Sequence, residues 1–328
     1  MIKPLLASAI SGAVLALVFP PWQIDLLVWI ALIPLLWSIH FSENPSQAAL
    51  FGWVSGFFFY GIDVRWVFDT LTVHGHFSEY LAGLILIVMI AFLALFTGLF
   101  SYLSRVVHKI GLSYCIIFPI TWVAVEYLRT YALTGFPWDL LGYSLAPRPN
   151  LIQIVDITGI YGLSFLIVFI NSAVFETLVN RTRSLTNVMA HLVIGIILVS
   201  ICAVYGFTKI TDYQEPMENR LKYNIGVLQG AIPQGVKWNE SYRSLTFSKY
   251  QELAGKSVAQ GAELLIWPET SVPVVIGGED LAWMAVIEIS KKLETPMLIG
   301  APAQTETSGV VDYFNSAFLV DGSEILSG

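Results

Sequence analysis

A glutamate that directly follows a short apolar stretch is the residue in this sequence best suited to acid–base chemistry. Residues 264–267 (LLIW) predict a buried strand. Pro268 ends this strand, because proline has no N–H to donate to a neighbouring strand. The next residue, Glu269, lies where a pocket can open, and partial removal from water would make its carboxylate a usable base. The alternative is an ordinary turn residue that faces water.

Short segments in both halves of the chain carry a family resemblance. In the C-terminal half they are VLQGAIPQ at 227–234, KW at 237–238 and LIWPET at 265–270. In the N-terminal half they are GFPW at 135–138, LGYS at 141–144 and GIYGLSF at 159–165. Together these segments resemble the bacterial apolipoprotein N-acyltransferases, a family that joins a multi-helix membrane domain to a nitrilase-like domain.

The resemblance implies a mechanism and two site residues. Nitrilase-type catalysis uses a glutamate, a lysine and a cysteine in chain order, and the cysteine holds the acyl group as a thioester. Glu269 matches the glutamate, which accepts the thiol proton, and no cofactor is implied. Trp238 matches a tryptophan that handles substrate, although a core or interfacial role is the alternative. The implied partners are a membrane phospholipid as acyl donor and a lipid-modified apolipoprotein as acceptor.

The sequence departs from the family pattern after Glu269. No lysine follows Lys292 and no cysteine follows Cys202, so neither the family's lysine nor its cysteine has a counterpart. The chain resembles roughly the first two thirds of the family, and we expect residues 1–328 alone to be inactive. The alternative function is a non-catalytic membrane remnant, or a fragment that binds lipid or lipoprotein.

The composition is that of a membrane protein. Hydrophobic residues make up 55% of the chain and charged residues 12%, with a mean hydropathy of +0.68. Residues 1–209 hold 9 basic and 9 acidic side chains, whereas residues 210–328 hold 8 and 15. This acidic excess excludes nucleic acid as an expected partner. The cysteines, Cys115 and Cys202, lie in apolar runs, so we predict no disulfide and no metal site.

Seven apolar runs predict a multi-pass membrane domain over residues 1–209, followed by a nitrilase-like domain over residues 221–328. The runs are near the length that crosses a bilayer. They cover residues 4–22, 26–41, 46–64, 80–104, 110–128, 157–178 and 185–207.

Lysine and arginine in the short loops predict the orientation. With the N-terminus in the cytoplasm, the inside loops hold Lys3, Arg105, Lys109, Arg181 and Arg183. The outside loops hold Arg65, Arg129 and Arg148. The positive-inside rule therefore favours a cytoplasmic N-terminus. Seven crossings then deliver the C-terminal domain to the periplasm, as part of a bacterial inner-membrane protein.

Strand and helix patterns alternate in the C-terminal part. Strands are predicted at 224–229, 263–267, 296–301 and 313–320, and helices at 239–258 and 279–293. This order is typical of a layered α/β domain. It fits a truncated nitrilase-like α-β-β-α sandwich.

Two features near the end of the fifth run are further candidates. Glu126 and Arg129 are three residues apart and could pair on one helical face. The connection at 134–144 is rich in glycine, proline and aromatic residues. It predicts a structured loop at the membrane surface.

Overall fold

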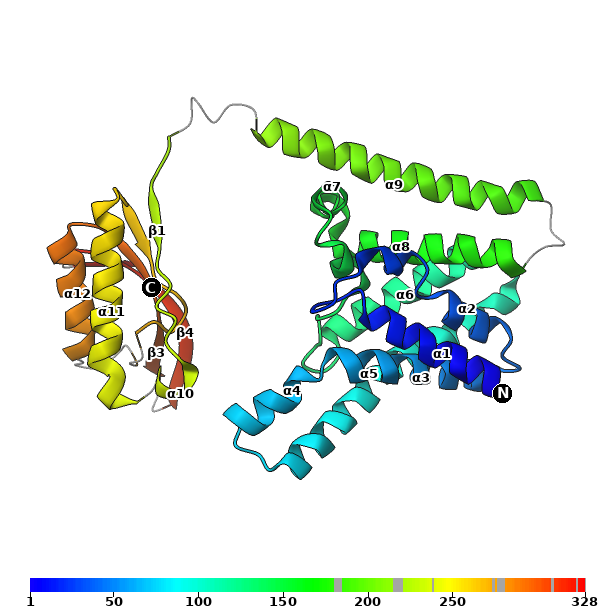
Figure 1. The fold of residues 1–328 in the computed structure, drawn as a ribbon, viewed down its shortest axis with the longest axis horizontal. Helices are drawn as coiled ribbons and strands as arrows, with labels where there is room; N and C mark the ends of the chain where they lie inside the picture. The colour runs from blue at the N-terminus through cyan, green and yellow to red at the C-terminus, as the bar shows by residue number, and fades with distance from the viewer. Residues whose placement is uncertain are drawn as a thin grey trace. The chain divides into compact units, whose positions relative to one another are not determined.

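The computed structural model describes residues 1–179, 185–214, 221–237, 239–272, 275, 281–307, 310–322 and 324–327. The chain divides into two compact units, Met1–Pro216 and Met217–Gly328. The first unit is helical, and the second combines strands with helices (Figure 1).

The first unit is built from long helices joined by short helical turns. The helices are α1 (Ile2–Ala16), α2 (Ile33–His40), α3 (Pro45–Asp63), α4 (Trp66–Asp69), α5 (Glu79–Val107), α6 (Tyr114–Tyr131), α7 (Pro149–Ile152), α8 (Val155–Val179) and α9 (Leu185–Gln214). The helical turns are η1 (Asp25–Trp29), η2 (Thr70–His74), η3 (His108–Ile110) and η4 (Leu141–Leu145). Each of the seven predicted apolar runs contains helix, which confirms their secondary structure.

Among the residues that the structure describes, three helical segments are long and apolar enough to cross a membrane: Glu79–Ile110, Val155–Val179 and Met189–Tyr213. The segments Ile2–Ala16 and Asp25–His40 are apolar but shorter. The described part of the first unit is therefore mostly helical, with three candidate membrane spans. The predicted total of seven spans stays a proposal.

Small residues let α3 and α5 approach each other closely. A Cβ atom on Gly52 of α3 would lie 2.2 Å from Ser101 Oγ and 2.3 Å from the Thr97 carbonyl oxygen, both on α5. Such close contacts are the usual way in which helices pack in lipid, where burial of apolar side chains supplies little driving force.

The side chain of Asn171, in α8, forms hydrogen bonds with the backbone on both sides of the break between η1 and α2. Its side chain is fully buried, and its Nδ2 donates to the carbonyl oxygens of Val28 at 2.8 Å and Ile167 at 2.9 Å. Its Oδ1 accepts the N–H of Leu32 at 3.0 Å. One amide thereby satisfies backbone groups on both sides of the break, which would otherwise be orphaned in an apolar environment.

The second unit is a mixed sheet with helices. Its strands are β1 (Ile225–Val227), β2 (Leu264–Ile266), β3 (Met297–Thr307), β4 (Val310–Asp321) and β5 (Glu324–Ser327), and its helices are α10 (Gln234–Lys237), α11 (Glu240–Ala259) and α12 (Leu281–Leu293). The strand order is β1-β2-β3-β4-β5, parallel from β1 to β3 and antiparallel beyond. The predicted alternation of strands and helices is confirmed.

The helices α11 and α12 lie together on one face of this sheet (Figure 1). The core between these helices and the sheet includes Tyr250 and Ala254 of α11, Ile289 of α12, and Leu265 and Ile299 of the strands. β5 was not predicted, because four residues after a turn give too short a pattern to read as a strand. The nitrilase-like sandwich stays a proposal.

Candidate functional site

The turn that carries Glu269 is attached to the neighbouring strand β3. The N–H of Trp267 donates to the Leu298 carbonyl at 2.8 Å, and the chain then leaves the sheet. Two donors of Ser271, its N–H at 2.9 Å and its hydroxyl at 3.1 Å, reach the carbonyl oxygen of Gly300. The N–H of Val272 reaches the same oxygen at 3.3 Å. This carbonyl therefore fixes the position of the turn.

Glycine is required at position 300 by close contact with the turn. A Cβ atom there would lie 2.7 Å from both Glu269 Cα and the Pro268 carbonyl oxygen, and 2.9 Å from Thr270 N. Real Cβ contacts are not this short, so any larger residue would displace the backbone of Glu269.

The side chain of Glu269 is exposed, so the predicted partial removal of its carboxylate from water is not observed. Its hydrogen-bond donor is a neutral side chain. Its Oε1 accepts a hydrogen bond from Nδ2 of Asn315, on β4. Nζ of Lys237, in α10, lies 3.3 Å from the backbone carbonyl oxygen of Glu269. The carboxylate is thus accessible to solvent and oriented by one hydrogen bond.

The second predicted site residue, Trp238, lies outside the residues that the structure describes. The helix that precedes it, α10, ends at Lys237. Since Lys237 contacts the backbone of Glu269, the segment that leads to Trp238 approaches the Glu269 turn. Its role in substrate handling stays a prediction.

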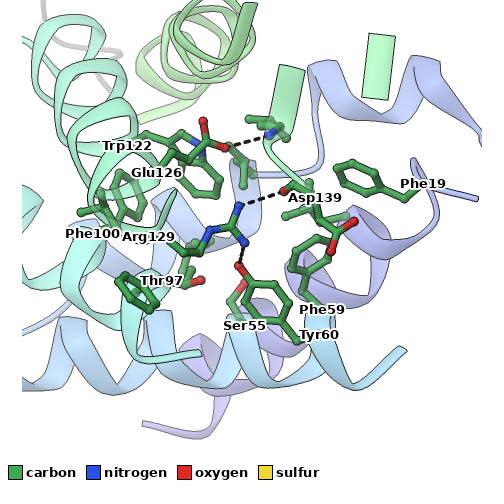
Figure 2. A pocket seen from close by; sticks show the side chains of 17 residues that line it. Phe19, Ser55, Phe59, Tyr60, Thr97, Phe100, Trp122, Glu126, Arg129 and Asp139 are labelled. Carbon is green, nitrogen blue, oxygen red and sulfur yellow. Dashed lines mark hydrogen bonds between the residues drawn. The ribbon is translucent and has the colours of Figure 1, made fainter. Parts of the chain in front are cut away.

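A buried polar cluster occupies the helical unit (Figure 2). Arg129 of α6 is 4% exposed. Its guanidinium donates to the Tyr60 hydroxyl and, at 3.2 Å, to the backbone carbonyl of Asp139. The guanidinium also lies 5.5 Å from the ring centre of Tyr60 and 5.8 Å from that of Phe136. Arg129 therefore ties the loop after α6 to α3.

The prediction that Glu126 and Arg129 could pair with each other is wrong. Oε1 of Glu126 instead accepts the backbone N–H of Leu141 at 2.7 Å, at the start of η4 (Figure 2). Among the described residues, no ion pair joins the two side chains within 4.0 Å. The loop offers nearer backbone partners to both, because it folds back over this face of α6.

These contacts confirm the prediction of a structured loop. Phe136 N–H donates to the Arg129 carbonyl at 2.9 Å, which starts the loop directly from α6. The ring of Trp138 lies 5.1 Å from that of Trp66, and both are exposed. Beneath the loop, a narrow cavity of about 30 Å³ is lined by the charged residues Glu126, Arg129 and Asp139 and otherwise mostly by apolar side chains. Aromatic side chains on the outside and charges beneath are typical of a membrane interface.

A second cluster in the helical unit was missed by the sequence analysis. Cys115, Glu176 and His191 come from α6, α8 and α9, yet one ligand atom of each lies within 4.8 Å of the others. No local spacing connects these residues, so only the packing of the three helices reveals the group.

Comparison with known proteins shows what the helical unit is similar to. The family model for the apolipoprotein N-acyltransferase N-terminal domain matches residues 11–173. This stretch includes the end of α1, all of α2 to α7, most of α8 and the buried Arg129 cluster.

Individual relatives extend the similarity through the second unit. An apolipoprotein N-acyltransferase of Geobacter metallireducens is 33% identical over 318 residues, which cover 96% of this chain and 60% of the relative. Relatives of the same name from Haemophilus ducreyi and Brucella melitensis are each 28% identical, over 94% and 96% of this chain. The chain is therefore similar to the apolipoprotein N-acyltransferases along nearly all of its length. It spans about three fifths of the length of these relatives.

Proposed function

We propose that this chain is part of an apolipoprotein N-acyltransferase. Such an enzyme transfers a fatty acyl chain from a membrane phospholipid to the N-terminal diacylglyceryl-cysteine of a bacterial apolipoprotein. The observation that carries the proposal is the similarity to enzymes of this name along 96% of the chain, through the helical unit and the Glu269 turn alike.

Glu269 is the proposed general base. In the thioester mechanism, a cysteine thiol attacks the acyl carbonyl of the phospholipid, and the base accepts the thiol proton and later returns it. The bond to the phospholipid oxygen breaks, and the acceptor amine then attacks the thioester. The support for this role is positional: Asn315 holds the Glu269 carboxylate, and the Gly300 carbonyl fixes the turn that carries it. Trp238, close in sequence to Lys237, is the proposed substrate-binding residue.

The substrates explain why a membrane unit belongs to such an enzyme. Both the acyl donor and the acceptor are anchored in a bilayer, so the active site has to work at the membrane surface. We propose a multi-pass domain of seven spans with a cytoplasmic N-terminus. The nitrilase-like domain then lies in the periplasm, outside the inner membrane, as the loop charges favour.

A second candidate function, lipid binding without catalysis, is favoured by a groove in the helical unit. The groove has a volume of about 410 Å³ and is lined by Trp29, Leu151, Ile170 and Leu192 and by other apolar residues of α9. The Asp25–Arg148 ion pair also lines the groove. A single acyl chain of a phospholipid is the occupant that fits an apolar groove with a polar margin in a membrane helix bundle.

The two functions are separated by one substitution. We expect Glu269→Gln in the full-length protein to slow acyl-thioester formation about 10²–10⁴-fold, because an amide cannot accept the thiol proton. The measurement incubates purified protein with phospholipid that is labelled in its acyl chain, and counts hydroxylamine-sensitive label on the protein. Glu252→Gln, an exposed acid on α11, is the matched control and should retain full labelling.

If Glu269→Gln forms the thioester at the normal rate, Glu269 is only a turn residue and its proposed role is wrong. If the unsubstituted full-length protein forms no thioester but still retains labelled phospholipid, the lipid-binding function is favoured instead.

A further inference from the structure

The cluster of Cys115, Glu176 and His191 unites three kinds of metal-binding side chain. Cys115 lies in the first turn of α6, Glu176 in the last turn of α8, and His191 in the second turn of α9. Cys115 and Glu176 are 1% and 2% exposed, whereas the His191 side chain is 29% exposed. A thiol, a carboxylate and an imidazole therefore lie close together. The partly exposed His191 side chain connects this buried group to the surface.

The carboxylate of Glu176 is already oriented by the start of α6. Its Oε1 accepts the Ser113 hydroxyl at 2.6 Å and the backbone N–H of Tyr114 at 2.8 Å. Its Oε2 faces His191, with Nδ1 at 2.9 Å. Hydrogen bonds of this kind, which fix one oxygen and leave the other for a ligand, are what holds metal-binding carboxylates in place.

We propose that Cys115, Glu176 and His191 bind a divalent transition metal of the zinc class. Zinc takes thiolate, imidazole and carboxylate ligands at about 2.0–2.3 Å, in tetrahedral geometry. Ligand atoms in such a site are roughly 3.3–3.8 Å apart. This spacing lies between the 2.9 Å that separates His191 from Glu176 and the 4.8 Å limit of the cluster. His191, the exposed member, is the ligand that has to shift.

Charge balance favours the same assignment. A divalent ion with one thiolate, one carboxylate and a neutral imidazole has no net charge. The thiol proton leaves to water as the sulfur binds the metal. Neutrality matters here because Phe169 and Ala173 of α8 form an apolar core with Cys115, where an unbalanced charge would be costly. Three protein ligands leave a fourth position for water or another ligand.

A purely structural role is the alternative. In it, the Glu176–His191 pair caps α6, and Cys115 packs in the apolar core with Phe169 and Ala173. The two interpretations differ in whether the sulfur binds a metal, which is a spectroscopic property.

The test is titration of the purified, metal-free, full-length protein with Co²⁺, which absorbs strongly when a thiolate binds it. We expect one equivalent to produce thiolate-to-cobalt absorption that Zn²⁺ abolishes by competition. Cys115→Ser should lose this absorption, whereas Cys202→Ser, which removes the other cysteine of residues 1–328, should keep it. Absence of the absorption from the unsubstituted protein, or its persistence in Cys115→Ser, would overturn the proposal.

A second variant guards against misfolding of Cys115→Ser. Ser113→Ala keeps all three ligands but removes the hydroxyl that donates to Glu176 and accepts the backbone N–H of Cys115. We expect Co²⁺ affinity to fall about 10–100-fold, the usual effect of losing such a bond. Unchanged affinity in a variant that elutes as a single folded species would show that Glu176 is not a ligand.

Discussion

The backbones of Gly300 and Glu269 are in direct contact, although 31 positions separate them in the sequence. The space for a Cβ atom at Gly300 is taken by Glu269 Cα and the Pro268 carbonyl, each 2.7 Å away. The location of the proposed base is therefore set by β3 as much as by β2.

Gly300→Ala tests this dependence. We expect the methyl group to push the Glu269 turn outward, to destabilise the second unit by about 1–3 kcal/mol, and to lower acyl transfer roughly 10²-fold through misplacement of the base. Unfolding and thioester formation of the full-length protein measure the two effects. The control is Gly255→Ala in α11, where nothing lies within 4 Å. Equal activity of the two variants would show that the contact does not position the base.

Arg129→Lys tests the attachment of the loop after α6. Lysine keeps the charge but loses the planar group that reaches Tyr60 and the Asp139 carbonyl together. A hydrogen bond from a charged group contributes about 1.5–3 kcal/mol, so we expect amide exchange in residues 136–141 to accelerate roughly 10–100-fold. Hydrogen-exchange mass spectrometry gives the rate. Arg105→Lys, whose arginine donates to the Ser42 carbonyl, should leave this segment unchanged.

Asn171→Leu tests how much the Asn171 hydrogen bonds at the break before α2 contribute to stability. The change leaves the Leu32 N–H and the Val28 carbonyl without their side-chain partner. Each orphaned group costs about 1–3 kcal/mol, so we expect a loss of roughly 2–6 kcal/mol. Unfolding of the detergent-solubilised protein measures it. Ser172→Ala is the control, because the buried Ser172 hydroxyl only donates within its own helix, to Val168. A loss as small as that of the control would show that the amide is dispensable.

Paired cysteine labelling tests the proposed orientation of the protein in the membrane. Ile110→Cys, at a position 72% exposed between α5 and α6, should react with a membrane-impermeant maleimide only after lysis. Lys249→Cys, exposed on α11, should react in cells whose outer membrane alone is permeable. The unsubstituted protein corrects for native thiols. The opposite pattern would reverse the proposed topology.

The sequence was most informative where a signal is local. Apolar runs located each long helix of the first unit, because twenty or so apolar residues leave few structural alternatives. A strand followed by Pro268 located the Glu269 turn for the same reason, since proline ends a strand within one residue.

The contacts of the candidate sites were not predictable, because they join distant segments. Asn315 lies 46 positions from Glu269, and the hairpin register that brings it there is set by pairing between β3 and β4. Arg129 binds Tyr60, 69 positions away, in preference to the nearby Glu126. Proximity in sequence predicted the wrong partner because the loop fold decides which groups are in reach.

The Asn171 contact also has a consequence for the order of events during synthesis. Leu32 is made 139 residues before the side chain that accepts its N–H. At about 5–20 residues per second, the ribosome reaches Asn171 roughly 7–30 s later. For that interval the second apolar segment, Asp25–His40, which is shorter than a typical span, has a break whose polar groups lack this partner. The contact that joins η1, α2 and α8 can therefore form only after α8 has been made.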